Sequence, residues 1–306
     1  MQEKTVHGGI RALEYEVGSS RFLIAPESGF RLMRWTLATA RETREILHWP
    51  EGNGETPFAN IRGGNPLLFP FAGRSFDRGV ENAWRDPDGN RLPMPRHGFA
   101  RDGSFEILSC NDTHICGVLI PTPEAMEAYP WDYTFTAAYH FEELAFRVEL
   151  TLENKGDKRI PWSAGHHFYF TLPWHTGAGR RDYRLNMEAR RCAYHGPDGK
   201  LVPRKDRETC HDLSDTDLLD RIHWQLRHNR VSFGPKGGEE DIHILVGKDP
   251  VPPKGFAVVT WSESGEAPYY CIEPWMGPPN AAEHGKGLHW VEPAEKGVFA
   301  VEVSLF

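Results

Sequence analysis

Cysteine is scarce in this sequence and follows no pattern. The 306 residues contain five cysteines, an odd number, and no two of them form the C-x-x-C pair common in zinc and redox sites. Their spacing therefore argues against both a disulfide framework and a zinc knuckle. We expect a protein of the reducing cytoplasm whose cysteines act as small buried hydrophobic residues. They are Cys110, Cys116, Cys192, Cys210 and Cys271.

Long apolar runs and blocks of positive charge are also missing. No stretch of eighteen apolar residues could span a bilayer, and the first residues lack the basic, apolar and small-residue order of a signal peptide. The formal net charge is −8, whereas a nucleic-acid surface needs clustered lysine and arginine. We therefore predict a protein with neither a membrane nor a nucleic-acid partner. Its 39% of hydrophobic residues can still form a core.

Strand signals recur along the whole chain. Residues 144–154 alternate apolar and polar side chains with a strict period of two, and residues 298–306 repeat this pattern. Such a period is typical of half-buried strands. No internal repeat or linker divides the chain. We therefore predict one all-β domain over residues 1–306, built from stacked antiparallel sheets.

Helical signals are few and short. Residues 123–130 favour one or two helical turns, with Thr122 as a cap and Pro123 in the first helical position. Residues 212–223 favour a second short helix. Neither segment is long enough to change the predicted fold class.

The stretch GHHFYF, residues 165–170, places two adjacent histidines inside an aromatic run. Successive side chains of a strand point to opposite faces of the sheet. His167 would therefore share a face with Gly165 and Tyr169, whereas His166 would lie with the two phenylalanines on the core face. The pattern predicts that His167, rather than His166, is accessible to a ligand.

Two further stretches place charged side chains beside glycine. Arg74 ends the segment RGGNPLLFPFAGR, and its fork of donors suits sugar hydroxyls, carboxylates or phosphates. A surface ion pair is the alternative interpretation of Arg74. His97 precedes a glycine that would permit the close approach of a ligand, although a lone histidine is more often structural than catalytic.

Glu273 lies in YYCIEPWMGPPN, residues 269–280, where a strand would place it on one face with Tyr269 and Cys271. Pro274 is expected to end that strand. A carboxylate among apolar residues loses hydration, which raises its pKa and suits a general base near neutral pH. The alternative is a buried glutamate paired with an arginine.

Several familiar catalytic patterns are absent. The sequence has no G-x-S-x-G elbow and no phosphate-binding glycine pattern. His166 and His167 cannot both bind one metal ion from a regular strand, and we predict no metal site. The remaining inventory favours an acid–base site for a neutral, hydroxyl-rich ligand.

Four stretches, in this order and spacing, resemble the aldose 1-epimerases, the galactose-mutarotase-like family. They are GGNPLLFPFAGR, HGFAR, GHHFYF and IEPWMGPPNA. The resemblance extends over most of the chain, and it is closer to the less characterised branches than to galactose mutarotase itself. It implies a large antiparallel β-supersandwich with a sugar-binding groove across one concave sheet.

The resemblance also implies a reaction. Members of this family interconvert the α and β anomers of an aldose. A base removes the proton of the C1 hydroxyl while an acid protonates the ring oxygen, and the opened sugar rotates about C1–C2 and closes again. No cofactor is needed, because proton transfer alone opens a hemiacetal. Glu273 matches the base, and His167, in the pattern His-x-Tyr-Phe, matches the acid.

Further residues carry over as sugar-binding groups. The resemblance implies that His97 hydrogen-bonds the sugar near C1 or the ring oxygen, that Arg74 binds it, and that Trp275 stacks on its C–H face. Asp241, in DIHILV, is the nearest counterpart of a late aspartate of the galactose mutarotases. The sequence departs from those enzymes at Gly73, where they carry asparagine, so the identity of the sugar stays open.

Two alternatives remain beside a mutarotase of free hexoses. A hexose 6-phosphate would need additional cations in the groove, and Arg34, Arg62, Arg96 and Arg101 are available. A non-catalytic sugar-binding or sensing protein is the other alternative, although a pure binder needs no matched acid and base. We expect a small sugar, free or phosphorylated, as the ligand, and a monomer or homodimer.

Overall fold

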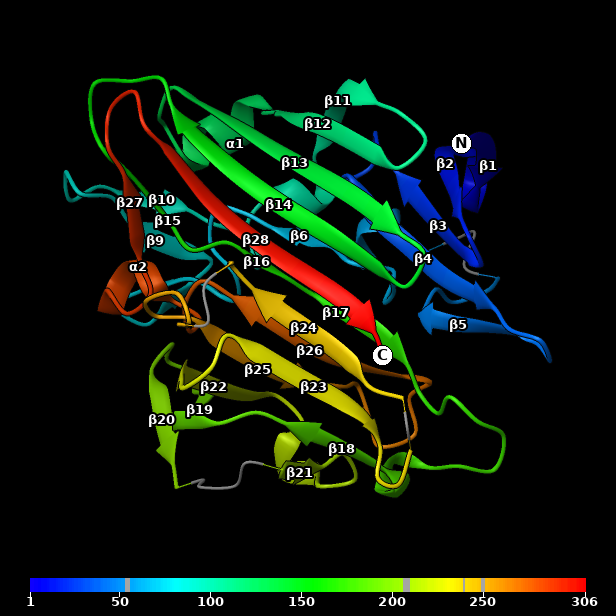
Figure 1. Ribbon diagram of the computed structural model, residues 1–306. Coiled ribbons are helices and arrows are strands. Elements are labelled where there is room, and N and C mark those ends of the chain that lie inside the picture. Colours follow the sequence, from blue (N-terminus) through cyan, green and yellow to red (C-terminus); the bar gives the residue numbers. More distant parts are fainter. Residues whose placement is uncertain (53–55, 206–209, 239, 249–250) are drawn as a thin grey trace.

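The computed structural model describes residues 1–52, 56–205, 210–238, 240–248 and 251–306. Strands make up about 52% of it and helices about 8%, which confirms the all-β class. Two large antiparallel sheets are stacked against each other (Figure 1). Within the described ranges, no helix combines the length and apolar character that crossing a bilayer requires.

The first sheet has thirteen strands in the described residues. Eleven follow one path, and β16 (Gly165–His166) and β6 (Leu67–Leu68) extend it where β16 pairs with β26. The path runs β1 (Gln2–Val6), β2 (Ile10–Val17), β3 (Ser20–Ala25), β4 (Arg31–Ala38), β5 (Thr43–Leu47), β17 (Phe168–Thr171), β26 (Tyr269–Trp275), β25 (Ala257–Trp261), β22 (Arg221–Leu226), β19 (Ala189–His195) and β20 (Leu201–Arg204).

The second sheet has nine strands in the same ranges and covers one face of the first. Its order is β11 (Ser104–Cys110), β12 (His114–Ile120), β13 (Tyr133–Glu142), β14 (Ala145–Asn154), β28 (Lys296–Leu305), β24 (Ile242–Val246), β23 (Arg230–Pro235), β18 (Tyr183–Asn186) and β21 (Cys210–Asp212). Three two-stranded pairs complete the described strands: β7 (Phe76–Asp77) with β8 (Val80–Glu81), β9 (Ala83–Arg85) with β10 (Arg91–Pro93), and β15 (Ile160–Trp162) with β27 (His289–Val291).

The two segments with the strictest alternation form the centre of the second sheet. β14 and β28 lie side by side in Figure 1, and Val148 pairs with Val301 in their antiparallel register. The apolar residues of β14, from Phe146 to Leu152, are fully buried, whereas the intervening polar residues are only partly covered. The predicted strands are therefore confirmed.

One predicted helix is confirmed and the other is wrong. In α1 (Pro123–Ala128), the Thr122 hydroxyl accepts a hydrogen bond from the amide of Ala125, as expected for a cap. Within residues 212–223, only Thr216–Leu218 form a 3₁₀ turn, which ends at the extended Leu219, and Asp220 follows with φ of +64°. The chain then enters β22, because pairing with β19 and β25 outweighs the local helical preference.

The remaining helical segments are also short. Besides α1, the described residues contain the α-helix α2 (Ala281–His284). The other 3₁₀ turns are His7–Gly9, Phe58–Asn60, Ala100–Asp102 and Arg180–Asp182.

The main hydrophobic core lies between the two sheets. Phe168 of β17 meets Phe146 of β14 with ring centroids 5.8 Å apart, and Trp35 of β4 contacts the same ring. One large cluster of buried residues contains members of both sheets. The first sheet therefore rests on the second by one face and leaves its other face available for a binding site.

Truncating a side chain in this core should destabilise the protein strongly. Leu150 is fully buried, so Leu150→Ala should lower the free energy of unfolding by about 2–5 kcal/mol through lost burial and a residual cavity. Leu144→Ala is the matched control, because Leu144 is 44% exposed and should cost less than about 0.5 kcal/mol. Urea denaturation measures both, and equal losses would contradict the assignment of the core.

Candidate active site

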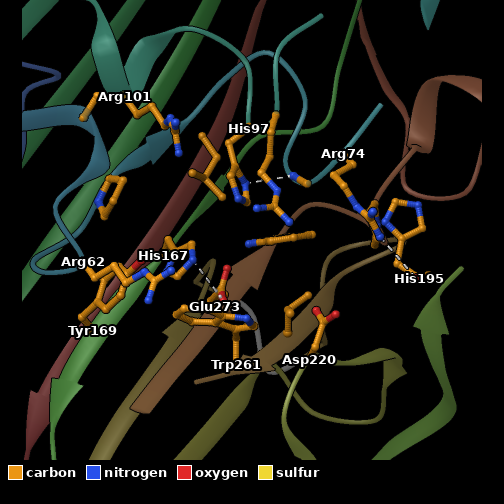
Figure 2. Close-up of a pocket in the computed structure, with 18 of the residues that line it drawn as sticks. Arg62, Arg74, His97, Arg101, His167, Tyr169, His195, Asp220, Trp261 and Glu273 are labelled. Atoms are coloured by element: carbon orange, nitrogen blue, oxygen red, sulfur yellow. Dashed lines mark hydrogen bonds and ion pairs between the residues drawn. The ribbon is translucent and has the colours of Figure 1, made fainter. Parts of the chain in front are cut away.

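A cavity of about 380 Å³ opens on the face of the first sheet that is turned away from the core. Side chains of β17, β26, β25 and β22 form its floor, and the loops around residues 59–74 and 96–101 form its walls. Figure 2 shows the labelled side chains converging on this space. Most residues singled out from the sequence meet here.

The two adjacent histidines point in opposite directions, as the alternation predicts. His166 is fully buried in the core side, where its ring stacks on Phe168 and Phe299 at 5.3 and 5.7 Å. His167 lines the cavity instead. The segment forms two short strands, β16 and β17, rather than one, yet the side chains keep the predicted faces.

Glu273 reaches the cavity from β26. Its strand pairs with β25 through Val259 opposite Glu273, and Cys271 lies on the same face. The expectation that Pro274 ends this strand is wrong. β26 continues to Trp275, which pairs with Ala257 on one side and Gly165 on the other, so two neighbours hold the strand beyond the proline.

His167 and Glu273 form a buried pair. The Nε2 atom of His167 lies 3.4 Å from Oε1 of Glu273, and Glu273 is only 2% exposed. Burial raises the pKa of Glu273 well above its usual range, and the nearby charge of Asp220 raises it further. Burial lowers the pKa of His167, with Arg31 and Arg101 adding to the effect. Between these two pKa values the two groups together carry one exchangeable proton.

The partner of Glu273 decides between the two interpretations of this carboxylate. Among the described residues, it forms no ion pair with an arginine, and its ion-pair partner is the imidazole of His167. When a carboxylate and an imidazole lie this close, one can accept a proton from a substrate atom while the other donates a proton to a neighbouring atom. This geometry fits acid–base chemistry better than a structural ion pair.

Asn65 holds the histidine segment in position. The side chain of Asn65 is fully buried, and its Oδ1 accepts a hydrogen bond of 3.1 Å from the backbone amide of His167. Its Nδ2 donates to the hydroxyl of Tyr139 and lies 3.2 Å from Nδ1 of His166. Tyr169 stacks on the His167 ring with centroids 4.5 Å apart. Several contacts thus fix the orientation of the imidazole.

A hydrogen bond from the backbone amide of Gly73 fixes the tautomer of His97. His97 has φ of +67°, and the amide of Gly73 donates a hydrogen bond of 3.1 Å to its Nδ1. Since Nδ1 accepts, the neutral ring carries its proton on Nε2 and can donate it into the cavity. Gly98 must be glycine, because a Cβ atom there would lie 1.9 Å from the carbonyl oxygen of Phe69.

Contacts with backbone carbonyls hold Trp275 on the floor and Arg74 at the edge of the cavity. The indole Nε1 of Trp275 donates to the carbonyl of His166 at 3.2 Å, and a Cβ atom at Gly165 would lie 2.5 Å from the indole ring. The indole is therefore packed flat on the strand. Arg74 donates to the carbonyl of His195 at 3.3 Å and lies 3.7 Å from Glu81, so its guanidinium is oriented at the cavity edge.

The late aspartate assigned from the sequence does not join this group. Asp241 precedes β24 in the second sheet, where Arg184 donates to it at 3.1 Å, and it does not line the cavity. Asp220 lines the cavity instead, directly before β22. Asp220 was missed because its segment was interpreted as a helix. An aspartate followed by the alternating residues Ile222, Trp224 and Leu226 was the available signal.

The cavity is rich in arginine. Among the described residues, five arginines line it, against the two carboxylates of Glu273 and Asp220. The five are Arg31, Arg62, Arg74, Arg96 and Arg101. Of the four arginines proposed from the sequence for a phosphate, three are present, whereas Arg34 does not line the cavity and pairs with Glu45 at 2.8 Å.

These arginines differ in how far their charge is already neutralised. Arg62 forms an ion pair with Glu263, and Arg101 lies 3.3 Å from Asp102. The side chain of Arg96 makes no hydrogen bond or ion pair with any residue that the structure describes. The cavity therefore favours a ligand that carries negative charge.

Cys271 lies beside His167 and Glu273, and the three side chains together could hold a metal ion. Ligand atoms of His167, Cys271 and Glu273 all lie within 4.8 Å of one another, and nitrogen, sulfur and carboxylate oxygen are ligands that zinc accepts. Such an ion would occupy both members of the pair, beside several arginines that repel a cation. The arrangement therefore fits proton transfer better than a resident metal.

Comparisons with known proteins agree with this architecture. Residues 53–286 match the family described as aldose 1-epimerase. The protein LacX, chromosomal, of Lactococcus lactis subsp. lactis is 25% identical over 247 residues, covering 73% of this chain and 77% of LacX. The Slr1438 protein of Synechocystis sp. PCC 6803 superimposes with a TM-score of 0.79 and 23% identity, over 100% of this chain and 99% of the other.

A further structure supports the fold. The galactose mutarotase related enzyme from Lactobacillus acidophilus superimposes with a TM-score of 0.76 and 22% identity, over 96% of this chain and 97% of the other. Likeness at this level of identity establishes the predicted galactose-mutarotase-like sandwich. The fold alone does not identify the reaction or the substrate, which depend on the chemistry of the cavity.

The protonation state of His97 offers a direct check of this geometry. We expect ¹⁵N NMR to find a neutral ring with its proton on Nε2 between about pH 6 and 8, because burial and the neighbouring His167 and arginines lower its pKa. A His97→Gln variant identifies its signals. A charged ring, or a proton on Nδ1, would contradict the contact with Gly73.

Proposed function

Because the chain belongs to the aldose 1-epimerase family, we propose that it is an isomerase, a mutarotase that interconverts the α and β anomers of an aldose. The observation that carries this proposal is the buried pair of His167 and Glu273, 3.4 Å apart on the floor of the cavity. Mutarotation requires two proton transfers, at the C1 hydroxyl and at the ring oxygen, which are neighbouring atoms of one sugar.

The proton count of the pair suits this reaction. In its charged form, the single proton resides on His167 and leaves Glu273 as a carboxylate. Burial favours the neutral form, and hydrogen bonds from a sugar hydroxyl to Glu273 and from Nε2 to the ring oxygen would offset that preference. Glu273 then takes the C1 hydroxyl proton, His167 protonates the ring oxygen, and the C1–O5 bond breaks as the C1 carbonyl forms.

The return step restores the pair. After rotation about C1–C2, the C5 hydroxyl attacks the other face of the carbonyl, its proton returns to His167, and Glu273 gives a proton to O1. No proton is gained or lost over the cycle, so the pair needs no further donor. A carboxylate and an imidazole at one site can therefore exchange the roles of acid and base between ring opening and ring closure.

The surrounding residues support binding of the sugar. His97 can donate from Nε2 into the cavity, and Asp220 and Arg74 offer an acceptor and a donor at the side opposite His167 (Figure 2). Trp275 lies against the floor beside His97, with ring centroids 5.8 Å apart. We assign these residues to orienting the hydroxyls rather than to proton transfer.

A second candidate keeps the reaction and changes the substrate to a hexose 6-phosphate. In a pyranose, C6 is attached to C5, next to the ring oxygen, so its phosphate would lie on the His167 side. Arg62 and Arg101 lie on that side in Figure 2, and the charge of Arg101 lowers the pKa of His167. Five arginines against two carboxylates favour this charged substrate over a neutral hexose.

Removing the base should abolish anomer exchange. We expect Glu273→Gln to lower kcat/KM at least about 100-fold, because the amide cannot accept the C1 hydroxyl proton. Exchange spectroscopy by NMR on glucose, galactose and glucose 6-phosphate measures this. Glu106→Gln, an exposed change of the same kind on β11, should leave the rate unaltered.

Three outcomes of that experiment are distinct. A loss of about tenfold or less at Glu273 would be too small for a base. Sugar binding without any exchange in the unaltered protein would favour the non-catalytic sugar-binding or sensing protein. Exchange that is lost in the Gln variant while sugar still binds would support the proposed roles.

The charge of Arg101 should matter more for a phosphorylated sugar than for a free one. We expect Arg101→Gln to lower kcat/KM for glucose 6-phosphate by at least about tenfold relative to glucose, through loss of a charge-assisted contact. Arg34→Gln is the matched control outside the cavity. Faster exchange of glucose than of glucose 6-phosphate in the unaltered protein would refute this substrate and leave the mutarotase reaction intact.

A further inference from the structure

A second cavity, of about 730 Å³, lies at the far edge of the first sheet. Strands β19, β20 and β22 and the segments 254–255 and 285–287 contribute its lining residues (Figure 1). Six of the lining residues are cationic, and none of those that the structure describes is acidic. The six are Arg190, Arg191, Arg204, Lys205, Lys254 and Lys286. This is unusual in a chain with 43 acidic and 35 basic residues.

Most of these charges have no partner among the residues that the structure describes. Arg204 forms an ion pair with Asp217 at 2.7 Å. The other five side chains make no hydrogen bond or ion pair with any described residue. Cations elsewhere are commonly paired, as where Arg85 and Arg91 share Asp77. These five side chains are exposed and carry like charges around one cavity, so an anionic ligand would lower their mutual repulsion.

The cavity wall is built on the sheet rather than on loose loops. Arg191 pairs with Trp224 across the antiparallel strands β19 and β22, and the indole is only 8% exposed. The next residue, Gln225, holds a left-handed backbone with φ of +56° inside its strand. Such strain in a non-glycine residue persists only where the surrounding structure enforces it, and it is common at binding sites.

We propose that this cavity binds a small molecule that carries a chain of two or more phosphate groups. One phosphate dianion would leave most of the five cations unpaired, whereas a linked chain of phosphates could reach several of them. The volume lies within the range of small-molecule sites. Trp224 is too deeply buried to offer a face for stacking a base, so the phosphates themselves are the recognised group.

The site is separate from the proposed active site. None of its lining residues lines the first cavity, although Ile222 and Trp224 alternate onto the same face of β22 and belong to one apolar cluster. The inference therefore does not rest on the mutarotase reaction. Either proposal can fail without the other.

Calorimetric titration with inorganic tripolyphosphate tests the site. We expect Arg191→Glu combined with Lys286→Glu to weaken the affinity at least about tenfold, because two attractive charges become repulsive. The matched control combines Arg41→Glu with Arg230→Glu, which removes the same charge from exposed positions on other parts of the fold. Circular dichroism confirms folding, and Arg190→Gln provides a milder second variant.

Titrations with different phosphate compounds show whether the phosphate chain alone is recognised. We expect adenosine triphosphate to bind about as well as tripolyphosphate, and orthophosphate at least about tenfold more weakly, since one phosphate meets fewer cations. Raising the salt concentration should weaken all three, because exposed charges are screened. Binding that requires the nucleoside would overturn the proposal.

Two further outcomes would also overturn it. Equal loss of affinity in the control double variant would mean that net charge alone attracts the anion. Loss of tripolyphosphate binding in Arg101→Gln, with binding retained in the Arg191 and Lys286 double variant, would place the anion in the first cavity.

Discussion

The alternation of side chains across β17 and β26 is the constraint on which the site depends. Phe168 pairs with Ile272 in the register of these strands, and both side chains lie in the core between the sheets. Burying such side chains stabilises the fold by about 1.5–3 kcal/mol each. Because a slip of one residue would exchange the two faces, the core holds His167 and Glu273 at the cavity. Hydrophobic burial on one side of the sheet therefore positions the groups proposed to transfer protons on the other.

The same burial sets the electrostatics of the cavity. Removing Glu273 and His167 from water disfavours the charged form of each, so the pair retains one proton over a wide range of pH. The surrounding arginines lower the pKa of His167 further, which disfavours a second proton on the pair, and they would attract an anionic sugar. One arrangement would thus account for both the proposed reaction and the proposed phosphorylated substrate.

The features that local sequence patterns predicted are those that depend on short-range periodicity. The two strands β14 and β28, the Thr122 cap and the opposite directions of His166 and His167 follow from spacing within a few residues. The family resemblance added the pairing of His167 with Glu273, which lie more than a hundred residues apart in the chain. Asp220 and the strand β22 were not predicted, because they depend on pairing between distant strands, and the same pairing decides which of the available arginines reach the cavity. That Asp241 lies outside this cavity could not be predicted either, since only the sheet order shows that the strand after it, β24, belongs to the second sheet.

The pH dependence of anomer exchange tests the shared proton most directly. Below the lowered pKa of His167 the pair gains a second proton and loses its base, and above the raised pKa of Glu273 it loses its only proton and with it the acid. We therefore expect kcat/KM to be level through neutral pH and to fall on both sides. The plateau should begin below about 4.3, the ordinary pKa of glutamate, and end above about 6.5, the ordinary pKa of histidine. A rate that keeps rising with pH above about 7 would contradict the account, because it would require a base without a partner acid.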